Sequence, residues 1–361
     1  MSGVIDVELE DIRQKLLWKP PSEDATRFLR VFMDQNTRCN LKCVTCGFSD
    51  PRVADYRGYD MPMWLYEKVA REVFPRALYV CLSLMSEPLM TRDFTDRLPA
   101  LERFAVPFSE VTTNGTLITP SVAERLVKSA LSRINVSIDA ANKKLFEEIR
   151  AGARFESVLR NWDLLRRLRG SAATPRLRLN HVLTEMNIGS FDDFLALARE
   201  LGADQLSVRT VARMSDAPVQ ESTDERFWGE VREARRRMKD FCVATSIVDS
   251  GYLRDRPARL DFLDEEGQPM MCRYPWTTLG IHANGNAFPC FAWTRKPAGN
   301  FVSATFDEIW NGEELTATRD EFERVRPGVD CAHCTIRRGA DDTNDDIFYR
   351  SLMQPAPPEQ P

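Results

Sequence analysis

Residues 28–46 read FLRVFMDQNTRCNLKCVTC, an apolar run followed by a segment with three cysteines. The apolar run from Phe28 to Met33 predicts a short buried strand. The loop after it carries three cysteines in the spacing C-x3-C-x2-C, at Cys39, Cys43 and Cys46. The sequence therefore predicts a cysteine-ligated centre in the loop that follows the first strand.

Three thiolates on one short loop can hold three irons of a cubane cluster and leave the fourth iron without a protein ligand. Such an open coordination site lets the cluster bind a substrate and transfer an electron to it. The alternative is a structural zinc ion, which takes four ligands. Because His181, His282 and His333 are all distant in sequence, a closed zinc site would need another cysteine from elsewhere in the chain.

Strand-like and helix-like segments alternate between residues 78 and 211. Such alternation is typical of βαβ units in a parallel sheet or barrel. With the first strand it makes six strands, fewer than the eight of a closed barrel. The further strands are predicted at 78–84, 108–113, 134–138, 177–183 and 206–211, and helices at 121–128, 143–150, 158–168 and 191–201.

The composition, with 43% hydrophobic and 29% charged residues, is that of an ordinary globular protein. A formal net charge of −5 does not indicate a nucleic acid partner. No run of about 18 apolar residues predicts a membrane span. The N-terminal MSGVIDVELEDI lacks the basic and apolar regions of a signal peptide, so we expect a cytoplasmic protein. There the nine cysteines are expected as thiols, metal ligands or catalytic groups rather than disulfides.

Changes in the sequence pattern divide the chain into five predicted segments. A short amphipathic helix near the N-terminus ends at Pro20 and Pro21, and a charged helical stretch runs from Glu225 to Lys239. Beyond Asp261, glycine-rich turns and cysteines replace the alternation. We predict a helical extension (1–27), a core barrel (28–220), a helical linker (221–260), a small cysteine-rich domain (261–353) and a disordered tail (354–361).

A second group of four cysteines lies in the predicted small domain. Two of them flank a hairpin turn at Asn284-Gly285-Asn286, and the other two form a distant C-x2-C pair. Four thiolates can close a tetrahedral zinc site or saturate one cubane, and the residues alone leave both open. The group consists of Cys272, Cys290, Cys331 and Cys334, whereas Cys81 and Cys242 lie in apolar segments and are expected to be core residues.

The segment CNLKCVTC, from Cys39 to Cys46, resembles the signature loop of the radical S-adenosylmethionine (SAM) superfamily. The resemblance covers about residues 28–215 and implies a partial (β/α)6 TIM-like barrel, in agreement with the six predicted strands. In that family the amino and carboxylate groups of SAM chelate the open iron of a [4Fe–4S] cluster. Reductive cleavage then gives a 5′-deoxyadenosyl radical that abstracts hydrogen from a substrate. The resemblance also implies an electron donor such as flavodoxin or ferredoxin.

The resemblance extends to polar residues at later strand ends. Glu87, in Met85-Ser86-Glu87-Pro88, resembles the acid of a Gly-Gly-Glu motif that contacts the SAM ammonium, for which a carboxylate is a charge-assisted acceptor. Plainer interpretations are a turn at Asn114-Gly115 and a helix cap at Ser137. The implied SAM-binding residues are Glu87, Thr113, Asn114, Ser137, Asp139 and Arg150, the last as a clamp for the SAM carboxylate.

Two positions depart from the family pattern. Thr45 stands where the family has an aromatic residue near the adenine, and Phe48 is a candidate substitute for it. Met85 and Ser86 replace the two glycines of the Gly-Gly-Glu motif. Both departures concern the SAM contacts and leave the prediction of cluster binding unchanged.

The second cysteine group, together with Gly299-Asn300 and the segment Phe306 to Trp310, resembles the shortened SPASM domain called the twitch domain. Because no cysteine follows Cys334, the resemblance implies one auxiliary [4Fe–4S] cluster with four protein ligands, with a [2Fe–2S] cluster or zinc as alternatives. A fully ligated cluster cannot chelate a substrate without losing a ligand, so we expect it to transfer electrons.

The two resemblances together imply a radical SAM oxidoreductase. Residues 1–27 are too few for a separate peptide-recognition domain, which favours a small-molecule substrate such as a sugar or cyclitol; a peptide-modifying maturase is the alternative. An iron–sulfur electron carrier or a zinc-stabilised binding module is the alternative of another class. Candidates for contact with the substrate are Arg209 and His181, with Asn180, although a one-residue error in the strand inverts which side chain points inward.

Overall fold

A computed structural model describes residues 27–49, 58–211, 222, 224–239, 244–248, 274–290 and 296–323. Within these residues one sheet of ten strands runs through the molecule, in the order β10-β9-β8-β1-β2-β3-β4-β5-β6-β7. None of the helices in the described part of the chain is long and apolar enough to cross a membrane.

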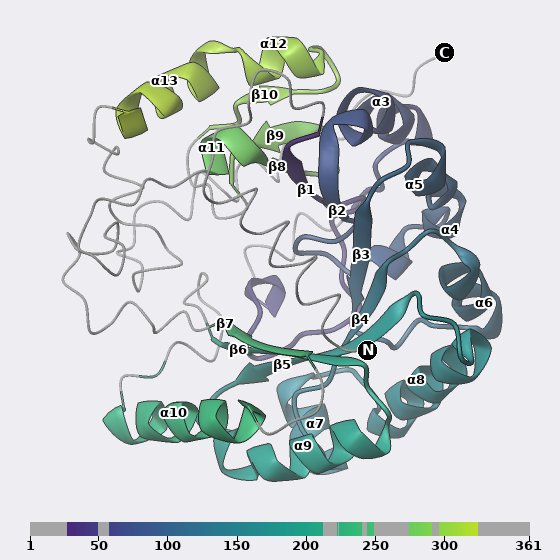
Figure 1. The fold of residues 1–361 in the computed structure, drawn as a ribbon, viewed down its shortest axis with the longest axis vertical. Helices are drawn as coiled ribbons and strands as arrows, with labels where there is room; N and C mark the ends of the chain where they lie inside the picture. Colours follow the sequence, from purple (N-terminus) through teal and green to yellow (C-terminus); the bar gives the residue numbers. More distant parts are fainter. Residues whose placement is uncertain are drawn as a thin grey trace.

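Six parallel strands form the centre of this sheet, and each pairs with the next one along the chain. In Figure 1 the sheet curves like part of a barrel wall, with the helices on its outer side. This confirms the predicted α/β partial barrel, in which the carboxyl ends of the strands share one edge. The six strands are β1 (Leu29–Met33), β2 (Ala77–Cys81), β3 (Phe108–Thr113), β4 (Arg133–Ser137), β5 (Arg176–Leu183) and β6 (Gln205–Thr210).

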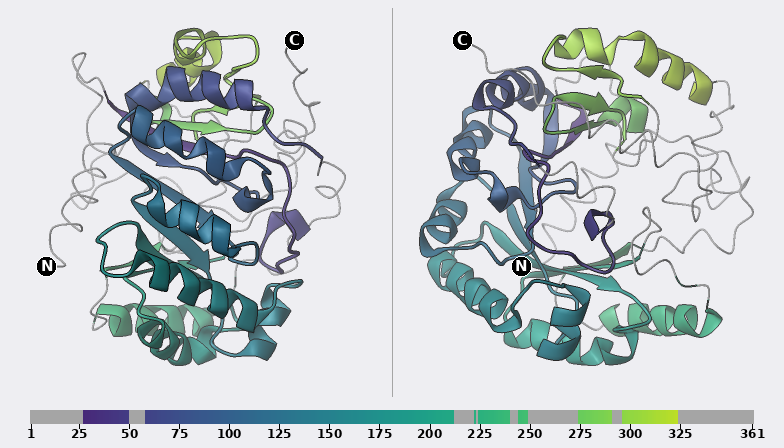
Figure 2. Two further views of the ribbon diagram at one scale, coloured as in Figure 1. Left: turned by 90° about the vertical axis from the view of Figure 1, so that its right-hand side faces the viewer. Right: turned by 180° about the vertical axis from the view of Figure 1, so that it is seen from behind.

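Helices connect successive strands and cover the convex side of the sheet, as the two views of Figure 2 show. In α8, for example, Val158, Trp162 and Leu165 are buried at spacings of four and three residues, the repeat of a helix with one apolar face. The helices are α3 (Met63–Val73), α4 (Phe94–Arg97), α5 (Pro99–Arg103), α6 (Pro120–Lys128), α7 (Lys143–Ile149), α8 (Phe155–Arg169), α9 (Phe191–Glu200) and α10 (Glu225–Lys239).

The two faces of the sheet differ in chemistry. Leu177 and Leu179 of β5 are fully buried in the apolar core shared with the helices. Because side chains alternate along a strand, Arg178 and Asn180 point to the concave side. The pairing places Arg178 beside Asn135 of β4 on one side and Gln205 of β6 on the other. The concave side therefore carries polar side chains from adjacent strands.

Four further strands extend the sheet beyond the six that were predicted. β7 (Ala244–Val248) runs parallel to β6 at one edge. On the other side β8 (Thr278–Ile281) runs parallel to β1, followed by the antiparallel β9 (Asn286–Phe288) and β10 (Gly299–Asn300). The C-terminal part of the described chain thus continues the same sheet through β1.

The predicted hairpin turn at residues 284–286 is confirmed, since it joins β8 to β9. Gly285 has a φ of +86°, in the left-handed region, and a Cβ there would lie 2.9 Å from Asn300 Oδ1. After β10, α12 begins with a capping box in which Thr305 and Glu308 each accept the other's backbone N–H. The helices of this part are α11 (Tyr274–Thr277), α12 (Phe306–Trp310) and α13 (Glu313–Glu323).

Several predictions concern segments outside the described residues. The N-terminal helix, the tail at 354–361 and parts of the predicted linker, including residues 249–260, are among them. The described part of that linker includes α10, which begins and ends at the predicted residues. The domain boundaries near 220 and 260 stay predictions.

Candidate functional site

The three cysteines of the first group lie on the loop directly after β1, where the partial barrel has its carboxyl-end edge. Backbone hydrogen bonds hold this loop against the last residue of α7 and the segment just after it: Val44 N–H donates to Ile149 O at 2.9 Å and Lys42 N–H to Ala151 O at 2.9 Å. Within the loop Cys46 N–H donates to Cys43 O at 3.1 Å, before the short 3-10 helix η1 (Gly47–Ser49). These backbone hydrogen bonds therefore help to set where the thiols lie.

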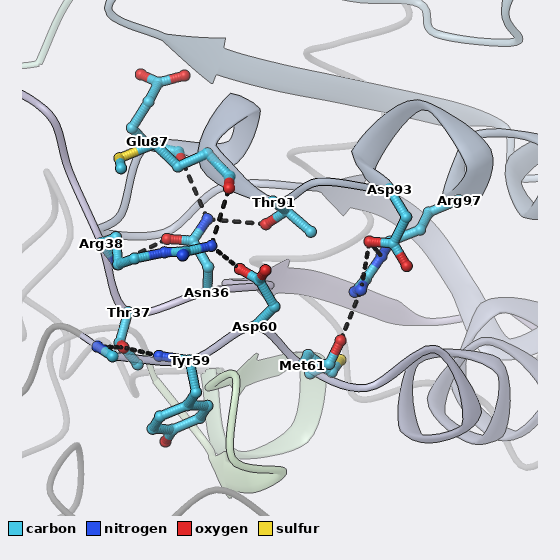
Figure 3. A network of polar contacts seen from close by, with 12 residues as sticks. Asn36, Thr37, Arg38, Tyr59, Asp60, Met61, Glu87, Thr91, Asp93 and Arg97 are labelled. Carbon is cyan, nitrogen blue, oxygen red and sulfur yellow. Dashed lines mark hydrogen bonds and ion pairs between the residues drawn. The ribbon is translucent and has the colours of Figure 1, made fainter. Parts of the chain in front are cut away.

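The start of the loop is anchored by polar side chains, shown in Figure 3. Asn36 Nδ2 donates to Glu87 O at 2.9 Å and to Thr91 Oγ1 at 2.8 Å. Arg38 pairs with Asp60 and donates to Met90 O at 2.9 Å. Sequence reasoning did not single out these residues, although a run of polar residues directly after a buried strand was a usable signal.

The three thiols of this loop are the donor set of an iron–sulfur cluster with one open iron. Cys39, Cys43 and Cys46 are half-buried and form no disulfide. Among the described residues, no three His, Cys, Asp or Glu side chains are spaced to hold one ion. In a cubane each cysteine binds a different iron at a different corner, so its cysteines lie further apart than the ligands of one zinc ion.

The electrostatics of the thiols agree with this donor set. Burial raises the pKa of Cys39 to about 11 and that of Cys43 to about 12. A bare thiolate is therefore disfavoured there, and bound iron would supply the compensating positive charge. Phe48 is buried and packs against Cys39, Cys46 and Met85, so an aromatic side chain does lie beside the cysteine loop despite Thr45.

The structure brings together Glu87, Thr113 and Asn114. The carboxylate of Glu87 accepts hydrogen bonds from Thr113 Oγ1 at 2.7 Å, from Asn114 N at 2.7 Å and from Leu89 N at 3.2 Å. Burial, opposed by these hydrogen bonds, raises the pKa of Glu87 to about 6. Asn114 Nδ2 lies 4.0 Å from Cys39 Sγ, so this group adjoins the cysteine loop.

Asp139 and Arg150 are also brought to the cysteines. Arg150 Nε lies 2.7 Å from Asp139 Oδ2, and Arg150 Nη1 lies 4.0 Å from Cys43 Sγ. The other oxygen of Asp139 accepts from Val182 N at 2.7 Å, so this fully buried carboxylate has partners on both sides. Ser137, also buried, ends β4 and pairs in register with Asn180 of β5.

The two candidates for substrate contact fall on opposite sides of the sheet. His181 is 1% exposed, stacks on Phe194 of α9 at a centroid distance of 4.0 Å, and places Nδ1 2.9 Å from Ile138 O. It therefore belongs to the helix layer. Arg209 is exposed and pairs in register with Val182, the neighbour of His181 that points the other way. The concave side holds Arg209 and Asn180, and not His181.

Of the second cysteine group only Cys290 is among the described residues; Cys272, Cys331 and Cys334 lie outside them. Cys290 follows β9 and is half-buried. Cys81 is 4% exposed, as expected of a core residue, and its Sγ lies 3.1 Å from Ser83 O. Cys242 lies outside the described residues.

Two models of known protein families match parts of this chain. One family model, the radical SAM superfamily, matches residues 36–198, and a second, the SPASM iron–sulfur cluster-binding domain, matches residues 272–335. The two families imply a SAM-binding [4Fe–4S] cluster in the first part of the chain and auxiliary cluster binding in the second.

Relatives match over most of the chain. Mycofactocin maturase MftC of Mycobacterium ulcerans (strain Agy99) is 30% identical over 314 residues, 83% of this chain and 79% of the relative. PqqA peptide cyclase of Granulibacter bethesdensis is 24% identical, over 76% of this chain and 71% of the relative. The crystal structure of Streptococcus suis SuiB bound to precursor peptide SuiA has the same fold, with a TM-score of 0.65 at 18% identity over 97% of this chain and 79% of that one. The chain therefore belongs to the radical SAM superfamily of enzymes and carries a SPASM iron–sulfur domain at its C-terminal end.

Proposed function

We propose that the chain is a peptide-modifying radical SAM enzyme. The main support for radical SAM activity is the loop of three half-buried thiols after β1. The carboxylate of Glu87 and its partners Thr113 and Asn114 lie beside Cys39 of this loop. The choice of a peptide is supported by the relatives that span both domains, one of which is a PqqA peptide cyclase. The small-molecule substrate favoured by the sequence becomes the alternative.

The proposed ligands of the SAM-cleaving [4Fe–4S] cluster are Cys39, Cys43 and Cys46. When bound, the cluster would supply the electron for the reductive cleavage of SAM. The resulting 5′-deoxyadenosyl radical would abstract hydrogen from the substrate. Glu87 would hold the SAM ammonium, because its carboxylate is ionised above a pH of about 6 and is already oriented by Thr113 and Asn114. Ser137 is assigned to the same cofactor at the end of β4.

Asp139 and Arg150 would act as a pair. Their separation of 2.7 Å fixes the guanidinium beside Cys43, where its remaining N–H groups can reach the SAM carboxylate. Asp139 keeps that guanidinium in place from a fully buried position. A buried carboxylate and guanidinium together add no net charge to the strand ends.

The substrate would bind on the concave side of the sheet. Arg209 is the proposed contact residue, because it is exposed there, and Asn180 lies on the same side. The Oδ1 atom of Asn180 is buried and has no hydrogen-bond partner among the described residues, which suits an amide or hydroxyl donor from a bound molecule. A peptide backbone offers such donors at every residue. For His181 we propose a packing role against Phe194.

The auxiliary site is assigned to Cys272, Cys290, Cys331 and Cys334. Four thiolates would saturate one [4Fe–4S] cluster, which could accept an electron from a substrate radical but could not chelate the substrate without losing a ligand. An electron donor such as flavodoxin or ferredoxin would supply the reducing electron for SAM cleavage.

The experiment uses anaerobically reconstituted protein, dithionite and SAM, with 5′-deoxyadenosine and the mass of an added peptide as readouts. The peptides tested are synthetic copies of the products of any short open reading frames that flank this gene. We expect 5′-deoxyadenosine release and a mass change in the peptide, both lost in Cys43→Ala. Turnover with sugars or cyclitols but not with the peptide would favour the small-molecule alternative. No 5′-deoxyadenosine under any reductant would refute the proposed activity.

A further inference from the structure

A buried carboxylate lies under the segment that carries Glu87. Asp34 follows β1 directly and is 4% exposed. It accepts hydrogen bonds from three consecutive backbone N–H groups: Leu84 at 3.0 Å, Met85 at 2.9 and 3.1 Å, and Ser86 at 3.1 Å. Ser86 Oγ donates to it as well, at 2.8 Å. One side chain thus binds the three residues that precede Glu87.

Asp34 is itself held by the sheet. Its backbone N–H donates to Ile281 O of β8 at 3.0 Å, so the carboxylate projects from a fixed point between two paired strands. The same stretch of chain holds Glu87 through its backbone, since Glu87 N–H donates to Arg38 O at 2.9 Å and Glu87 O accepts from Asn36 Nδ2 at 2.9 Å. Hydrogen bonds therefore join the segment 34–38 to each of the four residues from Leu84 to Glu87.

This contact accounts for the two non-glycine residues of the segment. A turn that converges three N–H groups on one point needs an acceptor there, because buried N–H groups without a partner are rare and costly. A carboxylate accepts all three with charge-assisted bonds. Met85 packs on Phe48 and Ser86 adds its hydroxyl to Asp34, so both side chains have a use that glycine could not provide.

We infer that Asp34 is a positioning residue for SAM, acting through Glu87. By fixing the turn at Leu84–Ser86 it keeps the Glu87 carboxylate against Thr113 and Asn114, next to the cysteine loop. The inference rests on the proposed role of Glu87 as a ligand of the SAM ammonium. Asp34 does not touch the cofactor in this arrangement, because its oxygens are occupied by the turn.

The test compares Asp34→Asn, Ser86→Ala and the surface control Asp96→Asn in the full-length, anaerobically reconstituted protein. Asp96 is exposed and pairs only with Arg125 among the described side chains. The readouts are iron content, the dissociation constant of SAM by calorimetry, the change in the EPR spectrum of the reduced cluster on adding SAM, and hydrogen exchange of residues 84–87.

For Asp34→Asn we expect wild-type iron content, faster exchange at residues 84–87, and SAM binding weakened about ten- to a hundredfold, the range seen when residues supporting a ligand are changed. KM for SAM should rise while kcat at saturating SAM stays near wild type. Ser86→Ala, which removes one of the contacts, should weaken SAM binding several-fold, and it decides the matter alone if Asp34→Asn does not fold. Asp96→Asn should match wild type.

Wild-type affinity for SAM in Asp34→Asn, with faster exchange at residues 84–87, would overturn the inference and leave Asp34 with a structural role only. Wild-type affinity in Ser86→Ala would do the same if it is the only variant that folds. These results would leave the proposed function intact. If the wild-type protein itself binds no SAM, the proposed function and this inference fail together.

Discussion

At the scale of single residues, the site is built from side chains that hold one another in position. Arg150 illustrates this. Its guanidinium lies between the carboxylate of Asp139, at 2.7 Å, and the sulfur of Cys43, at 4.0 Å. The pair is buried, with side-chain exposures of 10% and 0%. A buried ion pair of this kind adds little net stability, but removing one partner leaves an uncompensated charge.

Arg150→Gln should therefore destabilise the cluster-free protein by about 3–5 kcal/mol, because Asp139 keeps its charge in a buried place. Urea unfolding at neutral pH measures this. The matched control is Arg167→Gln, which removes an exposed guanidinium paired with Asp163 at 2.9 Å and should change stability by less than about 0.5 kcal/mol. Equal effects of the two substitutions would contradict the prediction.

At the scale of elements, a polar network on the sheet links five neighbouring strands. Glu110 of β3 pairs with Arg133 of β4 and lies 3.5 Å from Arg178 of β5. Tyr79 of β2 donates to Glu110 at 2.5 Å, and Arg133 donates to Gln205 of β6 at 3.1 Å. Burial opposes the charge of Glu110, but the two guanidinium groups hold its pKa well below the usual range.

The sign of this shift fixes a pH dependence. A carboxyl group with a lowered pKa in the folded state adds stability above its unfolded pKa, about 4.5, and loses it as the pH falls further. Glu110→Gln should be less stable than wild type by about 3–5 kcal/mol at pH 7. The gap should narrow below pH 4.5, as measured by thermal unfolding of both proteins across pH 3–7. A gap that is constant with pH would rule out ionised Glu110 as its source.

The strands show which parts of the fold could be predicted from the sequence. The six central strands were predicted within about three residues of their ends, because each is an apolar or β-branched run bounded by a helix with clear periodicity. The sequence did not predict which face of the sheet each side chain of β5 points to. Asn180 and His181 are adjacent, and only the register with β6 and the packing of His181 on Phe194 show that they lie on opposite faces. β8 was missed because four residues, TLGI, carry no readable period.

The site likewise contains residues that local sequence motifs indicate and contacts that they do not. The cysteine loop and the strand-end residues Glu87, Thr113 and Asn114 follow from motifs that are local in sequence. The contact of Asp34 with Met85 and Ser86 does not, because it joins positions about fifty residues apart across two strands. Only the paired sheet brings those strand ends together. Local patterns thus indicated the groups that are proposed to carry the chemistry, and not the side chains that hold them in place.

At the scale of the whole molecule, the chain is proposed to hold two clusters on separate cysteine sets. We expect about eight irons per reconstituted chain, and about four in Cys39→Ala/Cys43→Ala/Cys46→Ala. Cys290→Ala should keep the SAM-dependent change in the EPR spectrum while its iron content falls. Iron and sulfide analysis with EPR measures both. About four irons and one zinc in the wild-type protein would exclude an auxiliary iron–sulfur cluster and its role in electron transfer.

The two matched families also share one sheet, because β8 of the C-terminal part pairs with β1, the strand that leads into the cysteine loop. A chain truncated after residue 260 loses β8 and leaves the N–H and C=O groups along one side of β1 unpaired. It also loses Ile281 O, the acceptor for the backbone N–H of Asp34. An exposed edge strand favours association with other chains.

We therefore expect the truncated chain to elute as oligomers or aggregates in size-exclusion chromatography, and to bind SAM more weakly even when its first three cysteines are loaded with iron. The control is full-length Cys290→Ala, which removes an auxiliary ligand but keeps β8 in the sheet. If weak SAM binding follows from losing the strand, Cys290→Ala should bind SAM like wild type. If it follows from losing the auxiliary cluster, both proteins should be impaired alike, and the pairing of β8 with β1 would then have no part in forming the SAM site.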